Sequence, residues 1–248
     1  MVSEQKSSSK KGSAIQLEKH EIRTPAICAP VMGRKLDSME NILEKSIEEG
    51  ADLIELRLDK LEETVGWEKL LREDVPTIVT NRTDKEGGHF QGSENERVRI
   101  LLDAIASGAS CVDIELSTPE ERRNEILEAA EDRGTSVIIS FHDFQGVPPK
   151  QDLMRKTESM IEAGCDFAKI VCFANDAQEA LEMLDFLILA SEKIETPVIS
   201  FAMGEEGEFT RIAAPLLGSP ITYAPAGENT APGQMDISTT KNLLKCWD

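Results

Sequence analysis

The chain has 248 residues, with 27 lysines and arginines against 46 aspartates and glutamates, so its formal net charge is −19 at pH 7. This charge excludes general nucleic-acid binding and anchoring to an anionic membrane, because both require an excess of positive charge. The length suits either one large barrel or two small domains, and in both cases it is enough to bury a sizeable apolar core.

The N-terminal segment, with the sequence MVSEQKSSSKKGS, contains no apolar core. It is therefore expected to be neither a signal peptide nor a membrane anchor. We expect residues 1–19 to form a disordered polar tail and residues 20–248 to form a single catalytic domain.

Cysteine and histidine usage indicates the compartment and argues against one kind of site. The five cysteines are odd in number and include no CxxC pair, which predicts reduced packing thiols in the cytoplasm. The three histidines show no spacing with cysteine that is typical of a zinc site, so no metal is expected.

Short runs rich in β-forming residues alternate with amphipathic helical patterns about eight times along the rest of the chain, without a linker rich in Pro, Gly or Ser. The predicted strands are residues 26–32, 52–59, 76–82, 111–117, 136–143, 167–174, 197–203 and 221–226. The clearest helical patterns between them cover residues 38–50, 94–108, 119–134 and 176–193, and several close on glycine, as helices often do.

This alternation predicts the fold. About eight βα units in roughly 220 residues fit a single (β/α)8 barrel, the TIM barrel, whose usual size is about 250 residues. A doubly wound open sheet is the alternative. Against it, the segment VMGRKLDS at residues 31–38 lacks the GxGxxG pattern of dinucleotide-binding sheets.

Side chains on a strand alternate between two faces, and five consecutive predicted strands carry polar residues on one face. In residues 52–59, Glu55, Arg57 and Asp59 share a face and oppose an apolar one. The same division gives the polar positions of the other four strands: Thr80, Arg82, Asp113, Glu115, Ser117, Ser140, His142 and Lys169. In a closed barrel these polar faces converge on the barrel axis. Burying so many charged groups costs much free energy, which indicates that they have a functional role.

Lys169 interrupts the apolar strand FAKIVCFA and is a candidate for forming a Schiff base. Burial or a neighbouring cation lowers the pKa of lysines, and a neutral amine attacks a ketone. The alternative is an ion pair with Asp113 or Glu115. His142 lies on the preceding predicted strand. We favour a catalytic role for it over a purely structural role as a hydrogen-bonded core residue, because an imidazole near the amine can carry protons. Glu86, Asp113 or Glu115 can orient its ring, and the residues alone leave this choice open.

Three arginines are candidate substrate ligands: Arg57 and Arg82 by strand position, and Arg211 by its place in GEFTRIAAP. The planar guanidinium suits carboxylates and hydroxyl-rich ligands. For Arg57 the alternative is an internal pair with Glu55 or Asp59. Three glycine-bearing loops, KEGGHF, MGEEGEF and GENTAPGQM, are expected at the same barrel end, where active sites of this fold gather.

Several motifs follow one another along the chain, namely ELRLD, RTDKEGG, DIEL, SFHDF, AKI, SFAMGEEGEFTR and APGQ. In this order they resemble type I 3-dehydroquinate dehydratase, the Schiff-base class, from about residue 31 to the C-terminus. The resemblance implies a lyase that converts 3-dehydroquinate to 3-dehydroshikimate by syn elimination of water, the third step of the shikimate pathway to the aromatic amino acids. It also implies a small-molecule substrate, no cofactor and a homodimer.

The resemblance assigns roles to individual residues. Lys169 condenses with the ring ketone of the substrate, His142 removes the C2 proton and assists departure of the C1 hydroxyl, and Glu86 is the carboxylate associated with His142. Substrate contacts are assigned to Glu55, Arg57 and Arg82 at ring hydroxyls, Arg211 at the carboxylate, Thr230 and Gln234 in a closing loop, and Met203 and Phe144 in the apolar wall.

Some positions depart from the family pattern. Pro30 stands where a serine is often found, which removes one possible hydroxyl contact, and Phe141 stands where asparagine is frequent. Thr230 replaces a common serine and keeps a hydroxyl.

Two other functions remain open on the residues alone. A class I aldolase on the same barrel would bind a sugar phosphate at the loops after strands seven and eight, whereas Arg211 and ENTAPGQM suit a carboxylate better. A non-catalytic barrel that binds a small acid would be expected to lack Lys169 or His142, and this chain has both.

Overall fold

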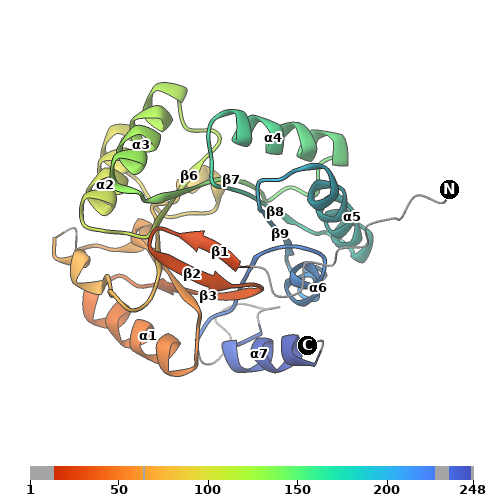
Figure 1. Cartoon of the computed structure of the whole chain (residues 1–248), viewed down its shortest axis with the longest axis horizontal. Coiled ribbons are helices and arrows are strands. Elements are labelled where there is room, and N and C mark those ends of the chain that lie inside the picture. The colour runs from red at the N-terminus through yellow and green to blue at the C-terminus, as the bar shows by residue number, and fades with distance from the viewer. Residues whose placement is uncertain (1–13, 64, 227–234, 247–248) are drawn as a thin grey trace.

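A nearly closed barrel of parallel strands is the centre of the computed structural model, which describes residues 14–63, 65–226 and 235–246 (Figure 1). Within these residues the eight strands follow the order β10-β3-β4-β5-β6-β7-β8-β9, so the last strand pairs with the first. Their bounds are β3 (Ala26–Met32), β4 (Leu53–Arg57), β5 (Thr77–Thr80), β6 (Cys111–Glu115), β7 (Ser136–Asp143), β8 (Phe167–Phe173), β9 (Val198–Met203) and β10 (Ile221–Tyr223). The predicted (β/α)8 barrel is confirmed, and the doubly wound sheet is wrong because no reversal of strand order occurs.

Helices surround the barrel, as Figure 1 shows. In the described part of the chain they are α1 (Leu36–Glu48), α2 (Glu94–Ala106), α3 (Glu120–Arg133), α4 (Lys150–Glu162), α5 (Ala177–Lys193), α6 (Thr210–Leu216) and α7 (Ile237–Lys245). Their buried residues recur with the helical period, as with Ala180, Met183, Leu187 and Ala190 in α5. These apolar stripes pack against the outer face of the strands. None of the helices described is long and apolar enough to cross a membrane.

One of the predicted βα units lacks its α-helix. Between β4 and β5 the described residues form two short 3-10 helices, η1 (Leu58–Lys60) and η2 (Trp67–Leu70). Gly66 precedes η2 with a φ of 90°, which interrupts any continuous right-handed helix at this point. Buried Trp67 and Leu70 cover the barrel here, so this unit has 3-10 turns in place of an α-helix.

An antiparallel hairpin precedes the barrel and consists of β1 (Ala14–Leu17) and β2 (His20–Arg23). Ile15, Leu17 and Ile22 are buried, and β3 begins shortly after β2, so the hairpin lies at the amino end of the barrel strands. Residues 14–19, which we assigned to the polar tail, therefore belong to this hairpin. The short period-2 pattern that buries Ile15 and Leu17 lies between polar residues and gives only a weak strand signal. The rest of the predicted tail lies outside the described residues.

The polar faces of the strands converge inside the barrel, as predicted. Glu55, Asp113, Lys169 and Tyr223, from β4, β6, β8 and β10, meet through hydrogen bonds across the interior. Side chains from alternate strands form such layers in (β/α)8 barrels. In β4 the opposite register, Ile54 and Leu56, is fully buried and apolar. The fold therefore places several ionisable groups close together in the interior of the barrel, where the surrounding apolar core limits their contact with water.

Candidate active site

Lys169 lies at the centre of this layer and is 4% exposed. Its Nζ donates hydrogen bonds to Asp113 Oδ2 at 3.1 Å and to Tyr223 OH at 3.0 Å. A longer contact of 3.4 Å reaches Glu55 Oε1. The three acceptors match the three N–H donors of an ammonium group. The ion pair with Asp113 that we considered from the sequence is therefore present, whereas Glu115 pairs with arginines instead.

Both carboxylates that contact Lys169 are held in place by other donors. Ser140 Oγ donates to Asp113 Oδ1 at 2.6 Å, and Arg82 Nη2 donates to Asp113 Oδ2 at 2.8 Å. Thr80 Oγ1 donates to Glu55 Oε1 at 2.9 Å. Burial raises the pKa of Asp113, but the charges of Arg82 and Lys169 outweigh it, so this pKa lies well below its usual range. Lys169 therefore faces a fixed anion.

His142 lies near the carboxyl end of β7, next to β8, and contacts Glu86 of the short helix η3 (Asp84–Glu86). Glu86 Oε2 accepts the backbone N–H of His142 at 2.9 Å and lies 3.2 Å from its Nδ1. Ser117 Oγ donates to Glu86 Oε1 at 2.7 Å. The sequence left open which of Glu86, Asp113 and Glu115 contacts the His142 ring, and in the structure this carboxylate is Glu86. With Nδ1–H donating to Glu86, Nε2 is the nitrogen left to accept a proton.

The surroundings of His142 keep its imidazole neutral. Burial lowers the pKa of His142 well below 6.5, and the positive charges of Arg82 and Lys169 lower it further against an opposing effect of Asp113. Burial raises the pKa of Glu86, although the hydrogen bond from Ser117 opposes this change. A neutral imidazole on the strand next to that of a buried amine is suited to remove a proton from a bound molecule.

Arg82 joins two carboxylates rather than standing free. Besides Asp113, its Nη1 donates to Glu115 Oε1 at 3.0 Å and to Ser140 Oγ at 2.6 Å. Glu115 Oε2 accepts a second guanidinium, that of Arg97 on α2, at 2.5 Å. Burial disfavours the charge of Arg82, but Asp113 and Glu115 more than compensate, and the pKa of Arg82 is raised. These ion pairs fix the floor of the site.

Arg97 is a residue that our sequence reasoning missed. It is 1% exposed and belongs to the buried stripe of α2, together with Val98, Leu101, Ala104 and Ile105. An arginine on the apolar face of a predicted helix is the signal that would have revealed it, because a charge buried there needs a partner.

Arg57 is anchored by Asp59, one of the two partners we considered for it. Arg57 Nε and Nη2 donate to the two oxygens of Asp59 at 2.8 and 3.0 Å, and His89 N donates to Asp59 Oδ2 at 3.0 Å. Arg57 Nη1 makes no hydrogen bond within the part of the chain that is described. The pair therefore fixes the direction of the guanidinium and leaves one of its nitrogens for a ligand.

Arg211, at the start of α6, has no ion-pair partner among the described residues. Its guanidinium lies 4.5 Å from the ring centroid of Phe201, and its Nη1 donates to the carbonyl of Tyr223 at 3.4 Å. Burial lowers the pKa of Arg211 to about 10, because Glu208 and Tyr223 only partly offset the loss of water. A half-buried cation that has no ion-pair partner in the described part of the chain is suited to bind a carboxylate.

The remaining predicted contacts differ in how well the structure places them. Met203 ends β9 and is half-buried. Phe144 follows β7 and packs over Gly87, where an added Cβ would lie 2.1 Å from its Cζ. Pro30 pairs with Glu55 in the β3-β4 ladder. Thr230 and Gln234 lie outside the described residues.

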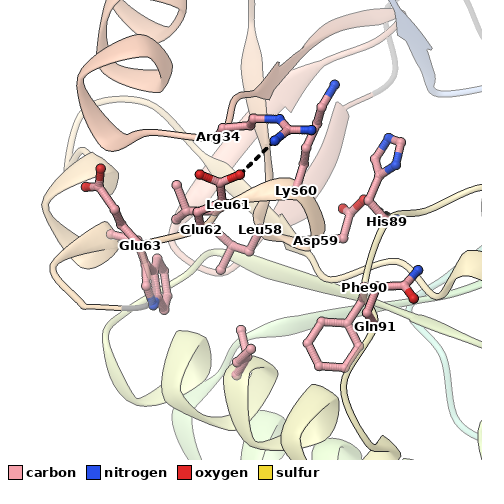
Figure 2. A pocket seen from close by; sticks show the side chains of 12 residues that line it. Arg34, Leu58, Asp59, Lys60, Leu61, Glu62, Glu63, His89, Phe90 and Gln91 are labelled. Carbon is pink, nitrogen blue, oxygen red and sulfur yellow. Dashed lines mark hydrogen bonds and ion pairs between the residues drawn. The ribbon is translucent and has the colours of Figure 1, made fainter.

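A separate cavity of about 640 Å³ opens beside this cluster, between η1 and the loop at residues 89–91 (Figure 2). Leu58, Trp67 and Phe90 line it, and an exposed ion pair between Arg34 and Glu62 crosses its rim at 2.8 Å. It shares Asp59 with the anchor of Arg57, but neither Lys169 nor His142 lines it. The described residues also contain no group of three or more His, Cys, Asp or Glu side chains arranged to hold a metal ion.

Fold and site together define the class of this protein as a (β/α)8-barrel enzyme whose ionisable residues gather inside the barrel. A sequence model of the type I 3-dehydroquinase family matches residues 27–248. The chain belongs to the type I 3-dehydroquinase family. Its enzyme class is 3-dehydroquinate dehydratase, type I, which confirms the resemblance that the motifs indicated.

Relatives and a solved structure agree with this assignment. Over 222 residues the chain is 37% identical to the 3-dehydroquinate dehydratase of Methanothermobacter thermautotrophicus. This alignment covers 88% of this chain and 95% of the relative. It is 35% identical over 225 residues to that of Methanocaldococcus jannaschii, covering 90% of this chain and 99% of the relative. The crystal structure of 3-dehydroquinate dehydratase from Geobacillus kaustophilus matches with a TM-score of 0.86 at 28% identity, covering 94% and 96% of the two chains.

Proposed function

We propose that this protein dehydrates 3-dehydroquinate to 3-dehydroshikimate by syn elimination of water, through an imine between Lys169 and the ring ketone. Family membership supports the dehydration step of the shikimate pathway. The observation that supports the imine is the position of Lys169, whose buried amine lies one strand from the neutral imidazole of His142. No cofactor takes part in this mechanism.

In the first stage the ammonium of Lys169 passes one proton to His142, and the resulting amine adds to the carbonyl carbon. The hydroxyl of the carbinolamine takes that proton back from His142 and leaves as water, which gives a protonated imine. The nitrogen of that imine carries a positive charge. Asp113 and Glu55, which contact Nζ, stabilise a cationic nitrogen. The charge at this point of the barrel is therefore the same for the ammonium and for the protonated imine.

In the second stage His142 removes the C2 proton. The electron pair of the C2–H bond moves toward the iminium, which gives an enamine, and Nε2 of His142 takes the proton. The enamine then expels the C1 hydroxyl, which receives a proton from His142 and leaves as water. Hydrolysis of the conjugated imine returns the amine and releases the enone product.

The other site residues bind the substrate in this proposal. Arg211 binds the carboxylate, the pair of Arg57 with its anchor binds a ring hydroxyl, and Glu55 and Arg82 complete the hydroxyl contacts. Met203 and Phe144 form the apolar wall, and Thr230 and Gln234 close over the site. Among the described residues, Arg57 Nη1 has no hydrogen-bond acceptor and Arg211 has no ion-pair partner, which supports these assignments.

Arg211→Ala is expected to lower kcat/KM by about 10- to 100-fold, chiefly through a higher KM, because a hydrogen bond to a charged group contributes about 1.5–3 kcal/mol. Steady-state kinetics with 3-dehydroquinate measure this change. The exposed Arg155, on the surface of α4, offers a matched control whose alanine variant is expected to keep the wild-type KM. An unchanged KM for Arg211→Ala would contradict its role at the carboxylate.

A substrate comparison tests the proposed function itself. The purified chain is offered 3-dehydroquinate and a set of phosphorylated ketoses, and formation of the enone is followed by ultraviolet absorbance. We expect turnover of 3-dehydroquinate only. Turnover of only the phosphorylated ketoses would favour an aldolase, and binding without turnover would favour a non-catalytic barrel.

We propose that the barrel is one catalytic domain located in a reducing compartment, the cytoplasm. The pairing of β10 with β3 supports a single domain, because it joins both ends of the barrel sequence in one sheet. All five cysteines are free in the described chain. Burial raises the pKa of Cys28 and Cys111 well above the usual value, as expected of unreactive packing thiols.

We also propose that the protein is a homodimer. Leu181 and Ile188 lie two turns apart on α5 and are 51% and 40% exposed, which supports an apolar contact with a second copy. Light scattering on the purified protein is expected to give twice the mass of one chain. A single-chain mass at micromolar concentration would contradict this proposal.

A further inference from the structure

Tyr223 is the fourth member of the layer around Lys169, and the mechanism above gives its side chain no role. It is the only tyrosine in the chain and the last residue of β10. Its side chain is buried, its hydroxyl accepts a hydrogen bond from Lys169 Nζ at 3.0 Å, and Nζ lies 4.4 Å from the ring centroid. The amine is thus held by both the hydroxyl and the face of the ring.

The same residue also contacts the surroundings of Arg211. The backbone carbonyl of Tyr223 accepts a hydrogen bond from Arg211 Nη1 at 3.4 Å. Its ring packs against Phe201 with 5.7 Å between centroids, and Phe201 also supports the Arg211 guanidinium. Tyr223 therefore lies between the amine that attacks the ketone and the cation that binds the carboxylate.

Imine formation changes which contacts the nitrogen of Lys169 can make. An ammonium has three N–H donors, whereas a protonated imine retains one. Asp113 carries a full negative charge and is held by two other donors, so it is the favoured partner of the remaining N–H. The hydroxyl of Tyr223 then loses its donor until hydrolysis restores the amine.

We propose that Tyr223 is a positioning residue that directs the Lys169 amine toward the substrate ketone and so sets the rates of imine formation and hydrolysis. This inference rests on the proposed function. Burial and the neighbouring charge of Glu55 raise the pKa of Tyr223 well above 10, so the phenol remains neutral and keeps its hydrogen-bonding ability over the working pH range.

Tyr223→Phe tests this inference, because it removes the hydroxyl and keeps the ring. Rapid mixing with 3-dehydroquinate, followed by a borohydride quench and intact-mass measurement, gives the rate at which the adduct accumulates. We expect that rate to fall about tenfold, with KM within about twofold of wild type. We also expect a smaller kinetic isotope effect on kcat with substrate deuterated at C2, because imine formation becomes rate-limiting. A merely structural role would not change the isotope effect.

Ser200→Ala provides the matched control. It removes one buried hydroxyl from the neighbouring strand β9, and Ser200 Oγ has no hydrogen-bond partner within the described residues. Its adduct rate is expected to equal that of wild type. A wild-type adduct rate in Tyr223→Phe would overturn the positioning role and leave the proposed function intact. Absence of any adduct in the wild-type protein would instead contradict the proposed function.

A second measurement does not depend on the folding of Tyr223→Phe. Because the chain has one tyrosine, labelling with 3-fluorotyrosine gives a single ¹⁹F resonance. Lys169→Met in the labelled protein is expected to shift this resonance, because it removes the donor to the hydroxyl. An unchanged resonance in a folded variant would contradict the contact on which the inference depends.

Discussion

Lys169→Ala is expected to lower kcat by about 10⁴-fold or more, because loss of a covalent nucleophile removes the imine pathway altogether. The fold is expected to remain. Asp113 keeps its hydrogen bonds from Arg82 and Ser140, and Glu55 keeps that from Thr80, so neither carboxylate is left without a donor. Steady-state kinetics and circular dichroism measure the two effects separately.

Lys193, an exposed lysine in the last turn of α5, offers the control for this substitution. Lys193→Ala is expected to retain wild-type kcat. A near-normal rate in folded Lys169→Ala would show that the imine mechanism is wrong, and it would leave Lys169 as a paired core charge.

His142→Ala is expected to lower kcat by about 10²- to 10⁴-fold, the usual range for removing a general acid–base group. Unlike Lys169→Ala, this variant is expected to form the borohydride-trapped adduct, although more slowly, because the amine is still present. His20, in the hairpin at the other end of the barrel, supplies the control, and His20→Ala is expected to keep the wild-type rate. Complete loss of the adduct in folded His142→Ala would contradict this division of roles.

The pH dependence of the wild-type enzyme tests the same residue without a substitution. Burial and the charges of Arg82 and Lys169 lower the pKa of His142, so the imidazole remains neutral as the pH falls through 6.5. The acidic limb of kcat/KM is therefore expected well below pH 6.5, where His142 finally gains its proton. A limb at or above pH 6.5 that disappears in a folded His142 variant would contradict this effect of burial.

The charges inside the barrel explain how one site holds many ionisable groups without repulsion. Arg82 joins Asp113 to Glu115, Arg97 neutralises Glu115 from the outer helix α2, and Lys169 contacts Asp113. Removing Arg82, which contacts both Asp113 and Glu115, would leave buried negative charge poorly compensated, which is strongly destabilising. Function, rather than stability, is the reason we propose for retaining these pairs, because apolar residues of similar volume can replace them without loss of stability.

Much of the fold was predictable because segments with the two-residue period of strands alternate along the chain with segments that have the 3.6-residue period of helices. Residues 26–32 and 136–143 form strands with the predicted bounds, and the polar register containing Glu55 does face the interior. The missing helix between β4 and β5 was not predictable from alternation alone, because short 3-10 turns bury Trp67 and Leu70 without a helical repeat. The hairpin at residues 14–23 was not predicted either, because its strands are too short to show a clear alternation of apolar and polar residues.

Site residues were predictable where their position within one strand was enough to reveal them. Contacts between side chains of two different segments were less predictable. Lys169 and His142 stand out because each interrupts an apolar strand. The partnership of His142 with Glu86 depends on how the loop after β5 folds back onto β7, which no local pattern states. Arg97 was missed because its partner, Glu115, lies on another element.

Borohydride trapping of the wild-type chain tests the central claim most directly. The protein is incubated with 3-dehydroquinate, reduced with borohydride and analysed by intact-mass spectrometry, and the modified peptide is then mapped. We expect one stable adduct per chain on the peptide that contains Lys169, which would show that this buried lysine forms the imine. A folded protein that gives no adduct with verified substrate, or an adduct on another lysine, would contradict the proposed mechanism.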